Sequence, residues 1–248
     1  MEHKLTNFEK LPVEVQRVFI PYLNDLISIH QDNCISAFIY GSGTGKSYFH
    51  NVSNINSGLI LRKLDFSSLT ASLKIVSKGL SQKIVAPLFL TKEYIQSSLD
   101  VFPIEFLEVK ENHILLYGED VLPSLKIPEQ YIKLFCEQQV KGKLIRVRQA
   151  FLENGLNKKA IESILKDSLQ ALWPVFRNLI RLKGVVPGHH KEEILQQITQ
   201  RYALDRDVFV TVYNAMAKVE KIPPEKLNVL FGLYIAELEK LASQLDRS

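Results

Sequence analysis

Two asparagines, Asn54 and Asn56, stand two positions apart at the start of an apolar segment, and a Gly-Ser turn, Gly41-Ser42, precedes them. In an extended chain, residues two apart point to the same face, so both amide side chains would face one site. Carboxylates in such a pair would hold Mg²⁺ beside a reacting phosphate. Asparagine offers an oxygen without a charge. The pattern therefore predicts a phosphate-handling site whose metal ligands are neutral.

Short β-type segments must position these residues. Residues 36–61 read SAFIYGSGTGKSYFHNVSNINSGLIL, and the apolar runs Cys34–Tyr40 and Ser57–Leu61 enclose a glycine-rich turn and a polar loop. We expect these runs to be neighbouring strands of one sheet, with Gly41-Ser42 at the C-terminal end of the first strand.

The same turn also offers a P-loop interpretation, because Gly45-Lys46-Ser47 matches the end of the Gly-x4-Gly-Lys-Ser/Thr motif. Counting back from Gly45 puts the required first glycine at position 40, which is Tyr40. A P-loop must also open directly into a helix. Residues 48–54 are instead rich in turn formers, so we favour the strand–loop–strand interpretation.

The segment resembles the nucleotidyltransferase superfamily, in particular its aminoglycoside-modifying members. That family pattern has a strand ending in Gly-Ser, about a dozen loop residues, and a strand that carries Asp-x-Asp. Here Asn54-Ile55-Asn56 takes the place of the acidic pair. The family's third carboxylate sits on a later strand, and we expect it within an extended Ile104–Val109 segment, with Glu105 as first choice and Glu108 as second.

The resemblance implies a catalytic role for Glu105 and a metal site formed by Asn54, Asn56 and Glu105. It also implies that a nucleoside triphosphate binds at Gly41, Ser42, Lys46 and Ser47. Nucleotidyl transfer needs magnesium to neutralise the phosphates. At a separation of 4 Å and an effective dielectric near 20, each lost carboxylate charge removes about 4 kcal/mol of attraction to a monovalent cation. For a divalent ion the loss is about twice as large.

We therefore expect a degenerate nucleotidyltransferase-like protein, in which magnesium binds weakly or not at all and transfer is slow or absent. One alternative is an active magnesium-dependent enzyme that passes a nucleoside monophosphate to a small molecule or protein. That enzyme would use Glu105 and another carboxylate such as Asp65. A further alternative is a non-enzymatic interaction protein that uses the fold as a scaffold for a protein partner.

The remaining segments predict an α+β fold with a mixed sheet and a C-terminal helical bundle. Residues 1–128 alternate strands with helices, whereas residues 129–248 contain no convincing strand. Glu129–Asn154 and Asn157–Lys183 have helical spacing and a short joining turn, so they should pair antiparallel across residues 129–183. Residues 189–248 predict a smaller module of three helices, near Lys191–Ala203, Asp205–Val219 and Pro224–Leu245.

Composition is that of an ordinary globular protein, with 248 residues, 46% hydrophobic and 23% charged. No apolar run approaches a membrane span and the N-terminus is too polar for a secretory signal, so we expect a cytoplasmic protein without a membrane partner. Residues 1–128 carry 12 Lys/Arg and 13 Asp/Glu, and the rest carry 19 and 14. This mild asymmetry suits a small phosphorylated ligand and argues against a nucleic-acid partner.

Overall fold

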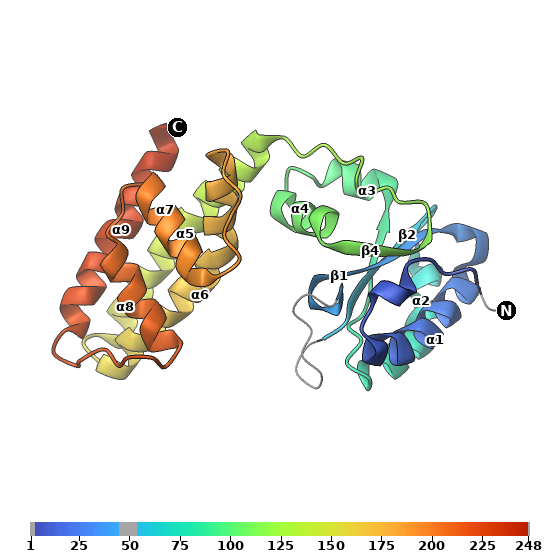
Figure 1. Cartoon of the computed structure of the whole chain (residues 1–248), viewed down its shortest axis with the longest axis horizontal. Helices are drawn as coiled ribbons and strands as arrows, with labels where there is room; N and C mark the ends of the chain where they lie inside the picture. The colour runs from blue at the N-terminus through green and yellow to red at the C-terminus, as the bar shows by residue number, and fades with distance from the viewer. Residues whose placement is uncertain (1–2, 45–53, 248) are drawn as a thin grey trace. The chain divides into compact units, whose positions relative to one another are not determined.

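The protein consists of two compact units, Met1–Ile127 and Pro128–Ser248 (Figure 1). The computed structural model describes residues 3–44 and 54–247. In the first unit, helices cover both faces of a four-stranded mixed sheet, and the described part of the second unit is helical. The predicted fold class, a mixed sheet with helices followed by a helical bundle, is confirmed.

The sheet has the strand order β3-β2-β1-β4. Its strands are β1 (Cys34–Tyr40), β2 (Asn56–Leu61), β3 (Leu88–Thr91) and β4 (His113–Gly118). Strand β1 pairs antiparallel with both β2 and β4, whereas β2 and β3 run parallel. The prediction that the first two apolar runs are neighbouring strands is therefore confirmed. Before β3, Ile84 forms an isolated bridge with Ile55, and Leu88–Thr91 then pair with β2.

One face of the sheet is covered by α1 (Val13–His30) and α2 (Phe66–Leu80), which enclose the larger core of this unit. Helix α1 continues through its internal Pro21. Helix α2 includes Gly79 and ends at Leu80. Gly79 lies against Tyr22, since a Cβ there would be 2.5 Å from the ring atom Cε2. The glycine thus lets the two helices approach closely.

The opposite face is covered by α3 (Lys92–Ser97), α4 (Pro103–Glu111) and the segment 121–127. The Thr91 side chain caps α3 by accepting a hydrogen bond from the Tyr94 amide at 3.1 Å. The prediction of an extended segment over 104–109 is wrong, because these residues belong to α4. A short apolar run does not distinguish a strand from a buried helix.

The second unit contains five helices within its described residues, and they share one core. Helix α5 packs against α6 and α9, and α6 packs against α7, α8 and α9. Near the centre, the Tyr234 hydroxyl donates to Ser168 Oγ at 3.0 Å, and its ring contacts Phe209. The helices are α5 (Glu129–Asn154), α6 (Lys158–Leu182), α7 (Lys191–Arg201), α8 (Arg206–Met216) and α9 (Leu227–Arg247).

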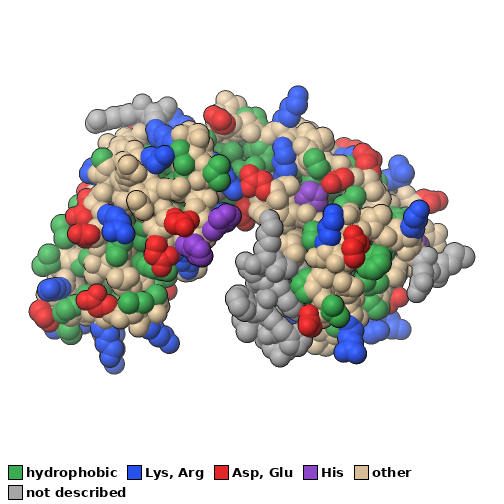
Figure 2. Space-filling view, viewed as in Figure 1, with side chains coloured by type: hydrophobic (Ala, Val, Ile, Leu, Met, Phe, Trp, Pro, Cys, Tyr) green, Lys and Arg blue, Asp and Glu red, His purple; other side chains and the backbone are tan. Residues whose placement is uncertain are grey.

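Charged side chains on α5 form ion pairs with α9. Lys141 forms ion pairs with Glu137, at 2.7 Å, and with Asp246, while Arg148 pairs with Glu239. On the face drawn in Figure 2, Lys and Arg side chains are spread among acidic ones and do not gather in one patch. In the part of the chain that the structure describes, no helix is long and apolar enough to cross a membrane.

Three short 3-10 helices complete the described elements. They are η1 (Phe8–Lys10), η2 (Gln31–Asn33) and η3 (Gly41–Thr44). The last of these follows β1 directly, so the Gly-Ser pair lies at the C-terminal end of β1 as the sequence predicts.

Candidate functional site

The candidate site begins where β1 ends. Tyr40, the last residue of β1, pairs with Asn56, the first residue of β2. Gly41 follows with a φ of 68°, in the left-handed region that favours glycine. A Cβ at Gly41 would lie 3.4 Å from Asn56 Nδ2, so the glycine keeps the backbone close to this amide.

Asn54 and Asn56 share one face of the chain. Ile55 between them is buried at 1% exposure in the core under α1 and α2. Side chains alternate along an extended chain, so the two asparagines face the side covered by α3 and α4. Asn54 is exposed and Asn56 is half-buried. A ligand can therefore reach the first amide without displacing the core.

Two of the predicted nucleotide-binding residues, Lys46 and Ser47, lie outside the described residues, and so does the predicted loop around them. Ser42 lies within η3 at the end of β1. The turn is closed by Thr44, whose hydroxyl donates to the Gly41 carbonyl at 2.8 Å. The choice between a P-loop helix and a strand–loop–strand connection stays a prediction here, because residues 45–47 decide it.

The structure places Glu105 in the first turn of α4, where its side chain is exposed. It therefore does not stand on a strand, as the extended interpretation required. The helix ends at Glu111, about 9 Å further along its axis, before the chain enters β4. Glu108 is also exposed on this helix. A metal-binding role for Glu105 stays a prediction.

Asp65, the carboxylate of the active-enzyme alternative, is the N-cap of α2. Its Oδ1 accepts hydrogen bonds from the Ser67 hydroxyl at 2.6 Å and from the Ser68 amide at 2.9 Å. Lys63 Nζ lies 3.1 Å from Oδ2. The Ser67 hydroxyl, the Ser68 amide and Lys63 together lower the pKa of Asp65 well below its usual value.

The structure places Asp65 at the other end of β2 from Asn54 and Asn56. Strand β2 carries the chain about 17 Å from Asn56 to Leu61, and Asp65 follows beyond that far end. Its oxygens are also engaged as a helix cap. The use of Asp65 as a second catalytic carboxylate stays a prediction, and the structure gives this carboxylate the role of a helix cap.

None of the four strands contains Asp or Glu. Among the described residues, no group of three or more His, Cys, Asp or Glu side chains is placed to hold a metal ion. Residues 45–53 also contain no Asp or Glu, so an acid that serves a metal near Asn54 and Asn56 must come from a helix or from another loop.

One pair of residues near the site was missed by the sequence analysis. His113, the first residue of β4, pairs with Tyr40 and so shares a row across the sheet with Asn56. Its Nε2 lies 3.0 Å from Asp120 Oδ1, and its Nδ1 lies 3.0 Å from the Val109 carbonyl. Since a carbonyl only accepts, Nδ1 donates. The only sequence signal was a histidine at the start of one β-type run and an acid shortly after its end.

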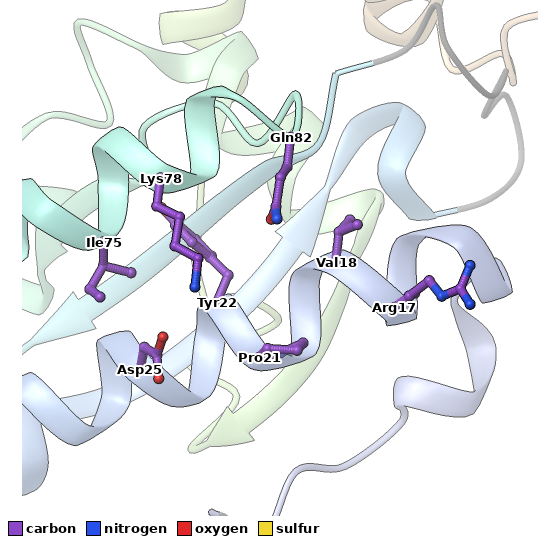
Figure 3. A pocket seen from close by; sticks show the side chains of 8 residues that line it. All are labelled: Arg17, Val18, Pro21, Tyr22, Asp25, Ile75, Lys78 and Gln82. Carbon is purple, nitrogen blue, oxygen red and sulfur yellow. The ribbon is translucent and has the colours of Figure 1, made fainter.

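Two hollows in the described part of the first unit lie away from this row. A groove of about 70 Å³ lies between α1 and α2, on the sheet face opposite Asn54 and Asn56 (Figure 3). The Tyr22 ring lines it, but the hydroxyl itself is buried, and burial raises its pKa to about 12. An open hollow of about 400 Å³ is lined by α3 and by residues 121–125, near the other end of the sheet.

The chain was compared with family models, curated proteins and solved structures. No family model matches the chain, and no curated protein matches it. Among solved structures, the chain is similar to spectinomycin adenyltransferase AAD(9) from Enterococcus faecialis, solved with ATP and spectinomycin. The sequence identity is 12%, the TM-score is 0.46, and the match covers 89% of this chain and 98% of the other.

Proposed function

We propose that the chain is a nucleotidyltransferase-like protein that binds a nucleotide beside Gly41, Asn54 and Asn56, with weak or no metal-dependent transfer. The strand pairing supports this proposal, because β1 ends in the Gly-Ser turn and β2 begins with Asn56. The resemblance of residues 36–61 to the superfamily pattern supplies the reaction class.

The observation that carries the proposal is the absence of acidic side chains among the described residues where β1 ends and β2 begins. Asn54 and Asn56 present amides to one face, and none of the four strands carries an acid. An Asn side chain has two N–H donors as well as an oxygen acceptor. It can therefore donate directly to a phosphate oxygen, which a metal-binding aspartate would repel.

Nucleotide binding at this corner is therefore expected to be independent of magnesium. Gly41 leaves room for a phosphate to approach the backbone, and the two amides can donate to it. Lys46 and Ser47 are proposed to supply a cation and a hydroxyl from the loop. Transfer is expected to be slow, because no fixed divalent charge would stabilise the developing charge on the phosphates.

Calorimetric titration with the four common nucleoside triphosphates, with and without Mg²⁺, tests this proposal. We expect saturable binding whose affinity changes less than about threefold when Mg²⁺ is added. Replacing both amides (Asn54→Ala with Asn56→Ala) should weaken binding at least tenfold. Binding that strictly requires Mg²⁺ would contradict the proposal, and no binding at all would favour a scaffold that only recruits proteins.

Charge restoration gives the sharper experiment. Asn54→Asp combined with Asn56→Asp should increase Mg²⁺ affinity, because it restores the anionic oxygen ligands that the ion prefers. Asn157→Asp combined with Asn228→Asp, at exposed positions at the start of α6 and on α9, adds the same two charges elsewhere and is the matched control. An equal gain in Mg²⁺ affinity for the control and the double variant would show that only bulk charge matters.

A measurement of catalytic turnover distinguishes the active-enzyme alternative from the degenerate protein proposed above. Mg²⁺-dependent release of pyrophosphate by the unmodified protein, abolished by Glu105→Gln but retained by Glu108→Gln, would show that α4 supplies a catalytic carboxylate. We expect neither release above the uncatalysed rate nor a difference between the two variants.

A further inference from the structure

Helix α2 carries an apolar stripe that faces away from the core. Phe66, Leu69, Leu73 and Leu80 are 83%, 42%, 63% and 59% exposed, and Val76 is half-buried. Their spacing alternates between three and four residues along the whole helix. This is the a/d pattern of helices that pack against another helix along one seam. We call these five residues the α2 stripe.

The α2 stripe is not needed to hold α2 on its own sheet. A different side of the helix contacts α1, where Ser72 Oγ lies 2.9 Å from His30 Nε2 and Gly79 lies against Tyr22. Figure 3 shows Ile75 and Lys78 projecting from α2 toward α1. The helix therefore has one side packed in the protein and a second apolar side without a partner among the described residues.

The positions that flank the α2 stripe are small or uncharged. At about 100° per residue, Thr70 and Ser77 border one edge, while Ser72 and Gly79 border the other. The lysines of this helix, Lys74 and Lys78, lie more than about 100° around the axis from the middle of the stripe. Two identical stripes can therefore meet without bringing like charges together.

We propose that the α2 stripe is an interface between two copies of this chain, which pair through antiparallel α2 helices about a two-fold axis near Leu73. Leu73 is the central member of the five, so an antiparallel pair places Phe66 of one copy near Leu80 of its partner. Such an interface uses the same surface patch on both subunits, as two-fold dimers do.

The size of the α2 stripe predicts a weak dimer. Its five side chains expose on the order of 500 Å² per copy, which is at the upper end for the largest apolar patch of a monomer. Pairing two copies would bury about 1,000 Å², the lower limit for a specific interface. The geometry points to dissociation in the micromolar range or above. The pairing also leaves Asn54 and Asn56 open, because α2 covers the opposite face of the sheet.

Sedimentation equilibrium across a wide concentration range tests the dimer. The wild-type chain should show a monomer–dimer equilibrium, and Leu73→Glu should weaken it at least tenfold, because it places two carboxylates at the axis. Leu152→Glu, at an 81% exposed position on α5, should leave it unchanged. Thermal denaturation of both variants should match the wild type, since exposed substitutions change stability little.

Site-directed cross-linking tests the geometry separately. Leu73→Cys should form a disulfide-linked dimer under mild oxidation much faster than Ala71→Cys, which lies on the polar side of the same helix. The native Cys34 and Cys136 are buried and should not compete. A wild-type chain that stays monomeric at millimolar concentration would overturn the proposal. A dimer unaffected by Leu73→Glu, or equal cross-linking of the two cysteine variants, would also overturn it.

Discussion

The two faces of the segment from Asn54 to Leu61, which includes β2, differ in how deeply their side chains are buried. Toward α1 and α2, the side chains of Ile55, Ser57, Leu59 and Leu61 are all at most 1% exposed. Toward α3 and α4, residues 54 to 60 change from an exposed amide through a half-buried amide to a buried glycine and a buried isoleucine. One face is therefore buried along its whole length, whereas the other, called the open face below, is exposed at Asn54 and half-buried at Asn56. Chemistry can vary there with little effect on the fold.

The packing face should show the largest response. Leu59→Ala removes a fully buried side chain from the core under α1 and α2, and we expect a loss of about 2–5 kcal/mol of unfolding free energy. Asn54→Ala, on the open face, should change stability by less than about 0.5 kcal/mol. Urea denaturation followed by circular dichroism measures both. Equal losses of unfolding free energy for the two variants would show that both faces contribute equally to packing.

Gly58 marks the point where the open face becomes closed. A Cβ there would lie 2.3 Å from Phe38 Cζ on the neighbouring strand, so Gly58→Ala must displace that ring. We expect a loss of about 1–3 kcal/mol from overpacking. Gly142→Ala is the matched control, because a Cβ on this α5 glycine meets nothing within 4 Å. It should be neutral or gain up to about 1 kcal/mol from helix propensity. Thermal unfolding measures both variants. A Gly58→Ala variant with the same Tm as the wild type would contradict the close-packing argument.

The features of the open face that depend on neighbouring residues could be predicted from the sequence. The alternation around Ile55 and the Gly-Ser turn predict β1, β2 and the shared face of Asn54 and Asn56, and pairing with β1 confirms the arrangement. The row through His113 could not be predicted, because nothing local specifies that β4 pairs with the other edge of β1. Which strands pair depends on packing between distant segments.

The error at Glu105 has a local cause. Ile104 and Phe106 alternate with polar residues and suggest a strand, whereas the buried Phe106 and Val109 are three residues apart, as on a helix. Pro103 at the first helical position favours the helix over the strand, since its fixed φ suits a helix start. A nine-residue helix leaves too few turns for its period to stand out against a short strand.

The contribution of Asp65 to stability should depend on pH, whereas that of Asn54 and Asn56 should not, because an amide does not titrate. The folded pKa of Asp65 is lowered, first by the Ser67 hydroxyl and then by the Ser68 amide and Lys63. A lowered folded pKa stabilises the protein above the unfolded value of about 3.9 and loses that effect as the pH falls below it. Asp65→Asn should therefore lower Tm at pH 7, and the difference from wild type should shrink below about pH 4. Asp32→Asn, an exposed change nearby, should show no such convergence.

The smallest stability effect, and the sharpest test of the open face, is expected for the charge-restored pair without metal. Asn54→Asp with Asn56→Asp places two carboxylates about 7 Å apart on one face, where their repulsion in water is about 0.6 kcal/mol. Tm should therefore fall slightly at low ionic strength, recover partly with monovalent salt, and recover fully with Mg²⁺, which binds both carboxylates. Either single variant should show little of this dependence, because it lacks the second charge. If added Mg²⁺ raised the Tm of the double variant no more than monovalent salt of equal ionic strength, the two positions would not converge on one ion, and the metal-site interpretation of this corner would be wrong.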